Sequence, residues 1–582
     1  MAQPAMNLVI NSHPELTTTV PDQTFYTLFE QYLEDYLREC PVHASQLGNH
    51  RYDDQLGTFT REGRENRTKS QRQMLKRLKE EVEWGDLSPS ARIDHEILCH
   101  DLEERIWLAE NIRDFEEDPR SYNLYLTDSV YTLLTQSSLP HEENISNAIA
   151  RIRRLPEVIA EARRSLTSPP LPVLETSISQ NRGVISFYQK GLYSLIGNSP
   201  QLAEVKEAAE HLVSHLSDYQ DFLENDVRAR ATDQWRLGKE KFKQKLQLSL
   251  NADLTADDVL RQAESEFERV TGEMYVNARQ LWAGYYEDLA LPPDDLEGRH
   301  QTITRVLQAV GQEHGAPEGL LSDARSTVEK LKKFISSKDI LRLPEPDQCE
   351  LTEMPEFHRG NSLAYIQPAP PLDPDNKTIY AISPPPANWS DQQVESFLQE
   401  YNRHMLQILT IHEAYPGHYV QLAYHNRETS PVRRLLLSGV FIEGWAVYTE
   451  QMMLDQGYGE GDLSLRLTQL KFYLRAVANA ILDHRMHCSS LSDEEALDFL
   501  MNRSFQSEGE ALLKIARSKQ STVQLSTYFV GRMALYELRR DIQREQGPDF
   551  ELGRYHEAVL AHGSLPVKYL GELVRRRLED PR

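Results

Sequence analysis

The sequence contains little cysteine and no long hydrophobic run. Its four cysteines, Cys40, Cys99, Cys349 and Cys488, are scattered among 582 residues without a C-x-x-C pair. This argues against a disulfide framework and a thiolate zinc site, and it predicts reduced thiols. No stretch approaches the roughly 18 apolar residues of a membrane span, and residues 1–10 lack the positive charge and apolar run of an export signal. The sequence therefore predicts a cytoplasmic protein with no membrane partner.

Positive charge is also scarce. The chain has 64 Lys and Arg against 89 Asp and Glu, a formal net charge of −25, and its one cationic run is residues 575–577. Binding of nucleic acid needs a basic surface that displaces phosphate counterions, so this composition argues against a nucleic-acid partner. The sequence contains neither a G-x-S-x-G nucleophile elbow nor a P-loop, which argues against the enzymes built on those motifs.

What the sequence does contain is helical periodicity. Residues 25–338 form a succession of segments with apolar residues three and four positions apart, which predicts helices. Thr255 is the expected N-cap of a long helix within residues 248–286. We expect an N-terminal tail (1–20), a helical half (21–345) and a catalytic half (346–582), in one continuous body.

Proline interrupts the helical pattern between residues 341 and 389, where helix is excluded over much of the stretch. Within it, residues 362–366 and 377–382 read as strands on either side of a turn at 373–376. The sequence therefore predicts a small antiparallel sheet that leads into the chemical part of the chain.

The next segment contains two histidines at an irregular spacing. Ser390 is the expected N-cap of a helix whose buried face runs from Val394 to His412. His418 follows six positions after His412, and six residues turn an unbroken helix by about 600°, so the two imidazoles would point in different directions. Pro416 and Gly417 offer a remedy, since a bulge at these residues would return His418 to His412.

A carboxylate further along the chain supplies a third candidate ligand. Glu443 stands among apolar neighbours in a helical pattern that runs from 441 to 457. A buried carboxylate needs a charged partner or a metal, and two imidazoles with one carboxylate leave zinc a fourth position for water. Glu450 lies seven residues on, on the same helix face, where it would either orient a zinc-bound histidine or stand in solvent.

These motifs resemble a known family. The run His-Glu-Ala-Tyr-Pro-Gly-His at 412–418, followed by Glu-Gly-Trp-Ala at 443–446, is similar to bacterial proteins catalogued as domain of unknown function 885. The likeness extends over nearly the whole chain and includes the later segments 474–487, 525–531 and 555–566. The resemblance implies a mainly α-helical, zincin-like fold with a deep cleft, related to neurolysin-type and carboxypeptidase-type metallopeptidases.

The resemblance also implies roles for single residues. His412, His418 and Glu443 would hold one zinc ion per chain, and Glu413 would be the general base, which agrees with its place about 100° round the helix from His412. Tyr528, or else His556, would donate a hydrogen bond to the oxyanion.

Other residues are open to two interpretations. Asp483 and His487, four apart, would form a hydrogen-bonded pair, either in the cleft or purely structural. Arg532 would bind a substrate carboxylate or stand in solvent. The chain also departs from the family pattern around Asp483 and at 521–524, where Ser-Thr-Val-Gln replaces a Pro-Gly-Gln.

The expected function is hydrolysis of peptide bonds in short peptides by a zinc-dependent metallopeptidase, with an extended substrate added to an edge strand of the hairpin at 365–382. Two alternatives stay open. One is a zinc-dependent hydrolase that cuts an amide or isopeptide bond in a small metabolite. The other is a non-catalytic helical binding protein that retains the metal site, although such a site needs no base and prefers four protein ligands.

Overall fold

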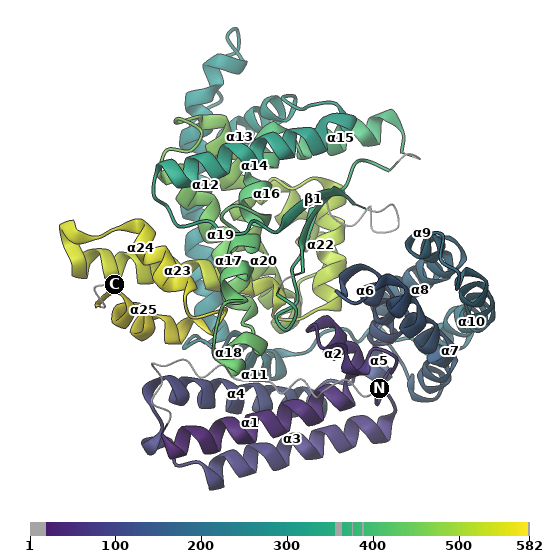
Figure 1. The fold of residues 1–582 in the computed structure, drawn as a ribbon. Coiled ribbons are helices and arrows are strands. Elements are labelled where there is room, and N and C mark those ends of the chain that lie inside the picture. The colour runs from purple at the N-terminus through teal and green to yellow at the C-terminus, as the bar shows by residue number, and fades with distance from the viewer. Residues whose placement is uncertain (1–18, 355–363, 375, 387–388, 580–582) are drawn as a thin grey trace.

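The computed structural model describes residues 19–354, 364–374, 376–386 and 389–579. The protein is mainly helical, as expected, with one small sheet (Figure 1). The N-terminal helices are α1 (Val20–Glu39), α2 (Pro41–Gln46), α3 (Arg61–Glu81), α4 (Pro89–Asn111), α5 (Asp114–Glu117), α6 (Ser129–Gln136), α7 (His141–Ser165), α8 (Leu171–Ser186), α9 (Leu192–Ile196), α10 (Leu202–Phe222), α11 (Lys239–Leu250), α12 (Ala256–Tyr285), α13 (Leu296–Gly311) and α14 (Leu320–Ser337).

The second part of the chain contains the sheet and the helices of the expected catalytic half. Its elements are β1 (Cys349–Glu353), β2 (Ala364–Gln367), β3 (Thr378–Ile382), α15 (Asp391–Glu400), α16 (Arg403–Glu413), α17 (His418–His425), α18 (Pro431–Leu435), α19 (Gly439–Asp455), α20 (Leu463–Cys488), α21 (Asp493–Asp498), α22 (Glu508–Gln520), the 3-10 turn η11 (Gln524–Ser526), α23 (Thr527–Gln546), α24 (Leu552–Leu560) and α25 (Leu570–Glu579). Among the described helices, none has the length and apolar character that a membrane crossing needs.

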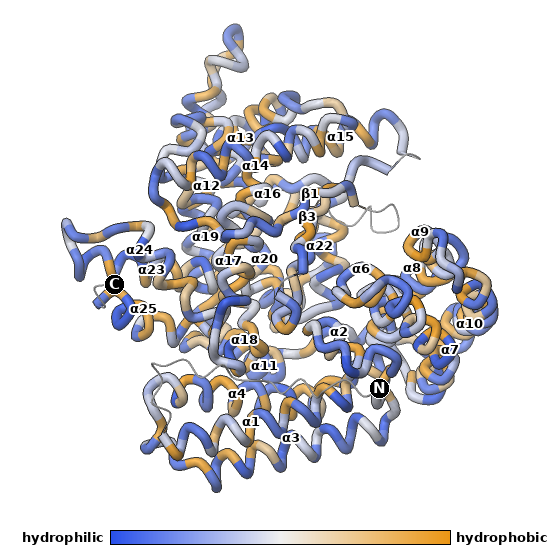
Figure 2. The backbone as a smooth tube through the Cα atoms, in the orientation of Figure 1, coloured by the Kyte–Doolittle hydropathy of each residue, from blue (hydrophilic) through white to orange (hydrophobic). Residues whose placement is uncertain are grey.

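Apolar side chains gather in three cores, and hydrophobic and hydrophilic residues alternate along the helices that enclose them (Figure 2). One core joins α1, α3 and α4 to α16, α19 and α24, and a second joins α12 and α13 to α20. The third is built from α6–α10 and neighbouring segments alone. Two cores therefore take side chains from both sides of the expected boundary at 345/346, and the division into halves stays a prediction.

The sheet differs in part from the expected one. Its strand order is β1–β3–β2, and β2 pairs antiparallel with β3, with Ala364 opposite Ile382, as the hairpin prediction requires. β1 was not expected, and it pairs parallel with β3, so the sheet is mixed. Part of the expected first strand (362–363) and of the turn (375) lies outside the described residues.

Side-chain caps explain where the helices begin. Thr255 and Ser390 both form capping boxes, with Asp258 and Gln393, as their positions predict. The prediction of a single helix from Ser390 to His412 is wrong, because the helix is interrupted at Tyr401 and Asn402. There the Asn402 side chain accepts hydrogen bonds from the backbone N–H groups of His404 and Met405 and starts α16 as a separate helix.

Candidate metal centre

The interruption of the helix between α16 and α17 determines where His418 lies. α16 ends at Glu413, the Tyr415–Pro416 peptide bond is cis, and α17 begins at His418. Gly417 lies so close to α16 that a Cβ atom there would be 1.9 Å from the carbonyl oxygen of His412, so only glycine fits. The expected bulge is thus a complete break, but it has the expected consequence: the rings of His412 and His418 stand 4.8 Å apart, centroid to centroid.

Close packing of α19 on α23 places Glu443. The two helices touch at Gly444 and Gly531, where a Cβ atom on Gly531 would lie 1.9 Å from the carbonyl oxygen of Val440. Glu443 precedes Gly444, so this contact fixes the position of the Glu443 backbone relative to the first turns of α23.

Gly531→Ala is therefore expected to destabilise the protein by about 1–3 kcal/mol, because the added methyl group meets helix backbone that cannot yield. Gly272→Ala is the control, since a Cβ on this α12 glycine meets nothing within 4 Å, and alanine there should be neutral or stabilising. The urea midpoint of unfolding measures both changes. Equal midpoints for the two variants would contradict the close helix contact.

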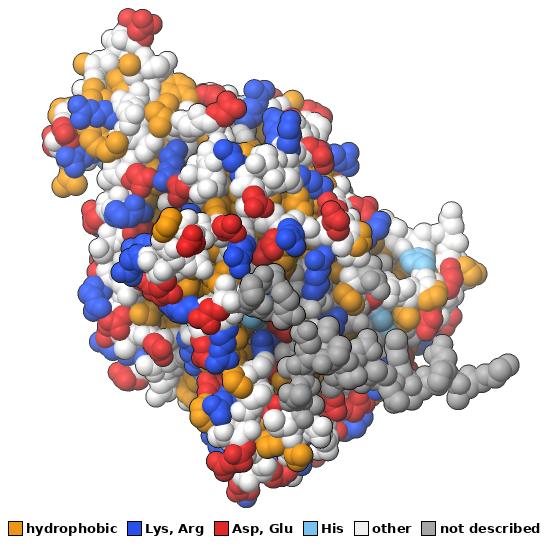
Figure 3. Space-filling view, turned by 60° about the vertical axis from the view of Figure 1, so that its left-hand side comes forward, with side chains coloured by type: hydrophobic (Ala, Val, Ile, Leu, Met, Phe, Trp, Pro, Cys, Tyr) orange, Lys and Arg blue, Asp and Glu red, His pale blue; other side chains and the backbone are white. Residues whose placement is uncertain are grey.

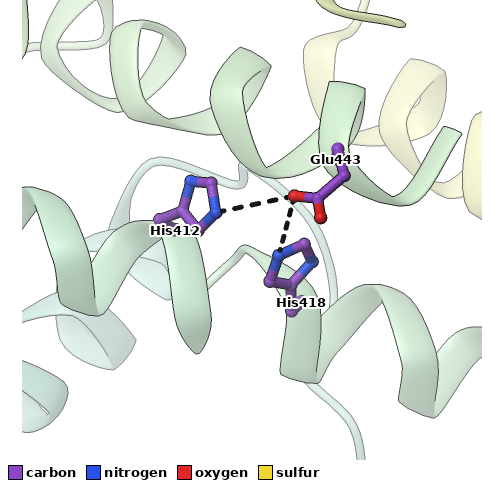
Figure 4. A group of neighbouring side chains, drawn as sticks. All are labelled: His412, His418 and Glu443. Carbon is purple, nitrogen blue, oxygen red and sulfur yellow. Dashed lines mark ion pairs between the residues drawn. The ribbon is translucent and has the colours of Figure 1, made fainter. Parts of the chain in front are cut away.

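Two histidines and one glutamate converge between α16, α17 and α19 (Figure 4). The Glu443 Oε2 atom is 3.6 Å from His418 Nε2 and 4.0 Å from His412 Nε2. Both distances exceed a hydrogen bond, and all three ligand atoms lie within 4.8 Å of one another. Both histidines are buried and Glu443 is half-buried. The three atoms therefore face a common point at ion-pair distances, with no hydrogen bond between them.

This donor set fits a zinc ion. Zinc–ligand distances of 2.0–2.2 Å place the ligand atoms of a tetrahedral site about 3.3 Å apart, slightly less than the 3.6 and 4.0 Å seen here. Burial lowers the pKa of His412 to about 3, so its imidazole is neutral and can offer a lone pair. Burial raises the pKa of Glu443, but His418 and His412 outweigh this and leave it below its usual value, as an anion. Burial lowers the pKa of His418, but the carboxylate of Glu443 outweighs this and raises it above its usual value, so a zinc ion would displace a proton from this ring. Two imidazoles in the neutral form and a carboxylate are ligands that zinc prefers.

Glu450 holds His412 from behind, one of the two arrangements expected for it. Its fully buried Oε1 atom accepts a hydrogen bond of 2.7 Å from His412 Nδ1. This bond fixes the ring orientation and leaves Nε2, on the far side, free to face Glu443 and His418.

Burial raises the pKa of the Glu450 carboxyl well above its usual range. Glu450→Gln should weaken zinc binding by about 10–100-fold, since the amide keeps an acceptor for His412 but cannot become the anion that makes a ligating imidazole more basic. Asp455→Asn, which changes a carboxylate of the same helix that pairs with Arg466, serves as the control. Competition with a chromophoric chelator measures the dissociation constants. Unchanged affinity in Glu450→Gln would show that this hydrogen bond does not support a metal ligand.

Glu413 lies beside the cluster at the last position of α16. Burial raises the pKa of its carboxyl to about 7, with a lowering effect from His418 and a raising effect from Glu443. Among the described residues, the Glu413 carboxylate forms no hydrogen bond. A carboxyl group with such a pKa is suited to exchange protons near neutral pH.

Tyr528, the first candidate for an oxyanion donor, also reaches the cluster. Its hydroxyl oxygen accepts hydrogen bonds from Gln524 Nε2 at 3.3 Å and Arg517 Nη2 at 3.5 Å. The hydroxyl proton of Tyr528 can therefore point towards Glu443, with which the hydroxyl interacts. Burial, followed by the charge of Glu443, raises the pKa of Tyr528, so the phenol stays protonated.

Asp483 anchors the turn before Tyr528 and does not pair with His487. Its carboxylate accepts hydrogen bonds from the backbone of Val523 (3.1 Å) and the hydroxyl of Ser526 (2.9 Å). Val523 has a φ of 73°, a conformation that favours glycine, at the place where the sequence departs from Pro-Gly-Gln. The expected pair is wrong because His487 accepts from Leu237 N and donates to the Ser518 carbonyl instead.

His556 and Arg532 lie in other networks. His556 Nδ1 donates to the Ile340 carbonyl, and Nε2 accepts from Tyr448, so neither ring nitrogen is free for an oxyanion. Its ring packs on Trp445, about 200° round α19 from Glu443. Arg532 is only 4% exposed and donates to Tyr473 and Gln451. It is therefore neither solvated nor available to a substrate, which corrects both interpretations of this residue.

Comparison with solved structures shows two proteins of the same architecture. A candidate lipoprotein of unknown function from Shewanella oneidensis is 29% identical, with a TM-score of 0.80 over 95% of this chain and 99% of its own. A candidate lipoprotein from Colwellia psychrerythraea is 17% identical, with a TM-score of 0.78 over 96% of this chain and 99% of its own. The second likeness shows the fold alone.

Comparison by sequence identifies the family. No curated protein matches the chain. Residues 41–574 match the family described as "Bacterial protein of unknown function (DUF885)", which covers nearly all of the described chain and includes every residue of the candidate metal centre. The chain therefore belongs to the DUF885 family of bacterial proteins.

Proposed function

We propose that the protein is a zinc-dependent metallopeptidase that hydrolyses short peptides. The observation that carries the proposal is the convergence of His412, His418 and Glu443 beside two groups that can move or share a proton, Glu413 and Tyr528. A zinc ion held by the three ligands would polarise the scissile carbonyl and lower the pKa of water. A purely structural metal would need neither of the other two groups.

Three side chains around the ligands have separate roles in the proposed reaction. Glu413 takes a proton from the water whose oxygen attacks the carbonyl carbon, and it returns that proton to the nitrogen as the C–N bond breaks. The Tyr528 hydroxyl donates a hydrogen bond to the carbonyl oxygen as negative charge develops on it. Glu450 keeps His412 in position throughout.

The sheet offers a place for an extended substrate. Among the described strands, β2 pairs with β3 alone and forms an edge of the sheet, and it contacts α16, the helix of His412 and Glu413. A peptide added to this edge would run beside the metal ligands, with backbone hydrogen bonds that tolerate different side chains. The deep cleft and the preference for short peptides are expectations drawn from related folds.

The direct test is incubation of the zinc-loaded protein with a mixture of synthetic di- to dodecapeptides, followed by mass spectrometry of the products. The small-metabolite alternative is tested in parallel with simple amides and isopeptides. Cleavage of peptides that depends on zinc supports the proposal, and cleavage of small amides alone favours the alternative. If neither is cleaved, the non-catalytic binding protein is the better account.

A cytoplasmic location is part of the proposal. The description of two structural neighbours as candidate lipoproteins argues against it. Fractionation of cells that express the full-length chain decides between these locations.

A further inference from the structure

A group of mostly half-buried charges lies between α15, α20 and α22. Two ion pairs organise it: Lys471 Nζ lies 2.8 Å from Glu400, and Arg475 Nη1 lies 2.9 Å from Glu510. Two more cations share the helix face of Glu510, since Lys514 and Arg517 follow it by four and seven residues. The cluster thus contains four cations and two carboxylates.

Among the described residues, Lys514 and Arg517 are the two cations of the cluster that form no ion pair with a carboxylate. Among the described residues, Lys514 forms no hydrogen bond or ion pair, and Arg517 donates only to Gln524 and the Tyr528 hydroxyl. Burial, followed by the charges of Arg475 and Arg517, lowers the pKa of Lys514 to about 7. Lys514 is half-buried and Arg517 is exposed. A half-buried ammonium without a counter-ion is unfavourable, so the site of Lys514 is suited to an added anion, which Arg517 can also reach from the solvent side.

Arg517 lies beside the candidate metal centre, and Lys514 lies one turn before Arg517 on α22. Arg517 Nη2 is 3.5 Å from the hydroxyl of Tyr528, which itself interacts with Glu443. On the other side, Phe472 stands between the cluster and the ligands, with Arg475 over its ring and His412 at its edge, 5.7 Å away. The neighbouring positions of α22, Leu512 and Leu513, are 51% and 61% exposed, so this helix also borders solvent.

We infer that Lys514 and Arg517 form a subsite for a carboxylate of the substrate. This rests on the proposed peptidase function and names the substrate class: peptides with a carboxylate close to the scissile bond. An extended chain advances about 3.5 Å per residue, so a group one or two residues beyond the scissile carbonyl reaches past Tyr528 to Arg517. The guanidinium and ammonium groups bind carboxylates through charge-assisted hydrogen bonds.

The same chemistry has two sources, the free C-terminus and an acidic side chain. The full-length, zinc-loaded Glu413→Gln protein separates them by titration calorimetry without turnover. The probes are Ala-Ala-Ala-Phe, its C-terminal amide, and Ala-Ala-Ala-Glu as its C-terminal amide. Each is measured with and without the added substitutions Lys514→Gln and Arg517→Gln, singly and together. Lys519→Gln is the matched control, since this lysine lies on the same helix but pairs with Asp493.

At least one peptide with a carboxylate should bind about tenfold or more tightly than the neutral amide, as one charge-assisted contact provides. Discrimination by the free acid assigns the C-terminus, and discrimination by the glutamyl amide assigns a side chain. The double substitution should reduce the ratio to about two or less, with Lys519→Gln unchanged. Because Lys514 has no hydrogen bond or ion pair among the described residues, and glutamine keeps part of its aliphatic stem, Lys514→Gln alone tests the subsite even if Arg517→Gln disturbs the fold.

Equal binding of all three peptides, or discrimination that survives the double substitution, would overturn the inference. Turnover by the protein with Glu413 intact separates the two proposals. Peptides that bind with discrimination but are not cleaved retain the subsite and refute the peptidase. Peptides that are cleaved regardless of charge retain the peptidase and refute the subsite.

Discussion

Glu413→Gln is expected to lower kcat for peptide hydrolysis by about 10²–10⁴-fold, the contribution of a positioned general base. The amide has the shape of the carboxyl but cannot take a proton from water. Because Glu413 is adjacent to His412 and is not one of the three converging groups, the variant should bind zinc as well as the native protein. Initial rates and zinc content, measured on the same preparation, check both expectations.

Two results would contradict the role of Glu413. Activity within a factor of a few of the native rate, with zinc retained, would mean that another group moves the proton. Loss of zinc together with activity would make Glu413 a ligand and would leave the base unidentified. The raised pKa of Glu413, caused by burial, agrees with a proton-transfer role but does not replace this test.

Tyr528→Phe is expected to reduce kcat by about 10²–10³-fold, with a smaller change in KM, because the hydroxyl stabilises charge that develops only in the transition state. Tyr536→Phe is the matched control. It lies on the same helix, and its buried hydroxyl has no hydrogen-bond partner among the described residues. The control should keep native kcat.

An equal effect of the two tyrosine substitutions would show that α23 tolerates no change of this kind, and it would remove the oxyanion role. An increase in KM alone for Tyr528→Phe would place the hydroxyl in ground-state binding. Asp483, which holds the turn of Val523 and Ser526, is a positioning residue for Tyr528, so its substitution should affect kcat through the same hydroxyl.

The convergence of His412, His418 and Glu443 could be predicted from the sequence because each residue leaves a local signal. Pro416 and Gly417 stand between the histidines, and the structure uses both, one in a cis peptide bond and the other in a close approach to α16. Glu443 is a carboxylate in an apolar helix, a position that is unfavourable without a partner. Figure 4 shows that the two histidines and Glu443 lie together between their helices.

Other features depend on contacts that no local pattern reveals. β1 pairs with β3 across 29 residues of sequence, and its own residues, Cys-Glu-Leu-Thr-Glu, alternate weakly. Arg532 and His487 were misjudged because their partners come from distant helices. The excess positive charge at Lys514 and Arg517 was missed for a different reason. Acidic and basic side chains are interspersed over the surface shown in Figure 3, and the net charge of a chain does not reveal the charge of one cluster.

The measurement that tests the central claim most directly is the zinc content of the protein purified without chelators, by elemental mass spectrometry, beside Glu443→Ala. Asp455→Asn on the same helix controls for the loss of a carboxylate. The account predicts one zinc ion per chain in the native protein and the control, and none in Glu443→Ala. Native protein that binds no zinc even after incubation with the ion, or Glu443→Ala that retains it, would contradict a metal centre at His412, His418 and Glu443.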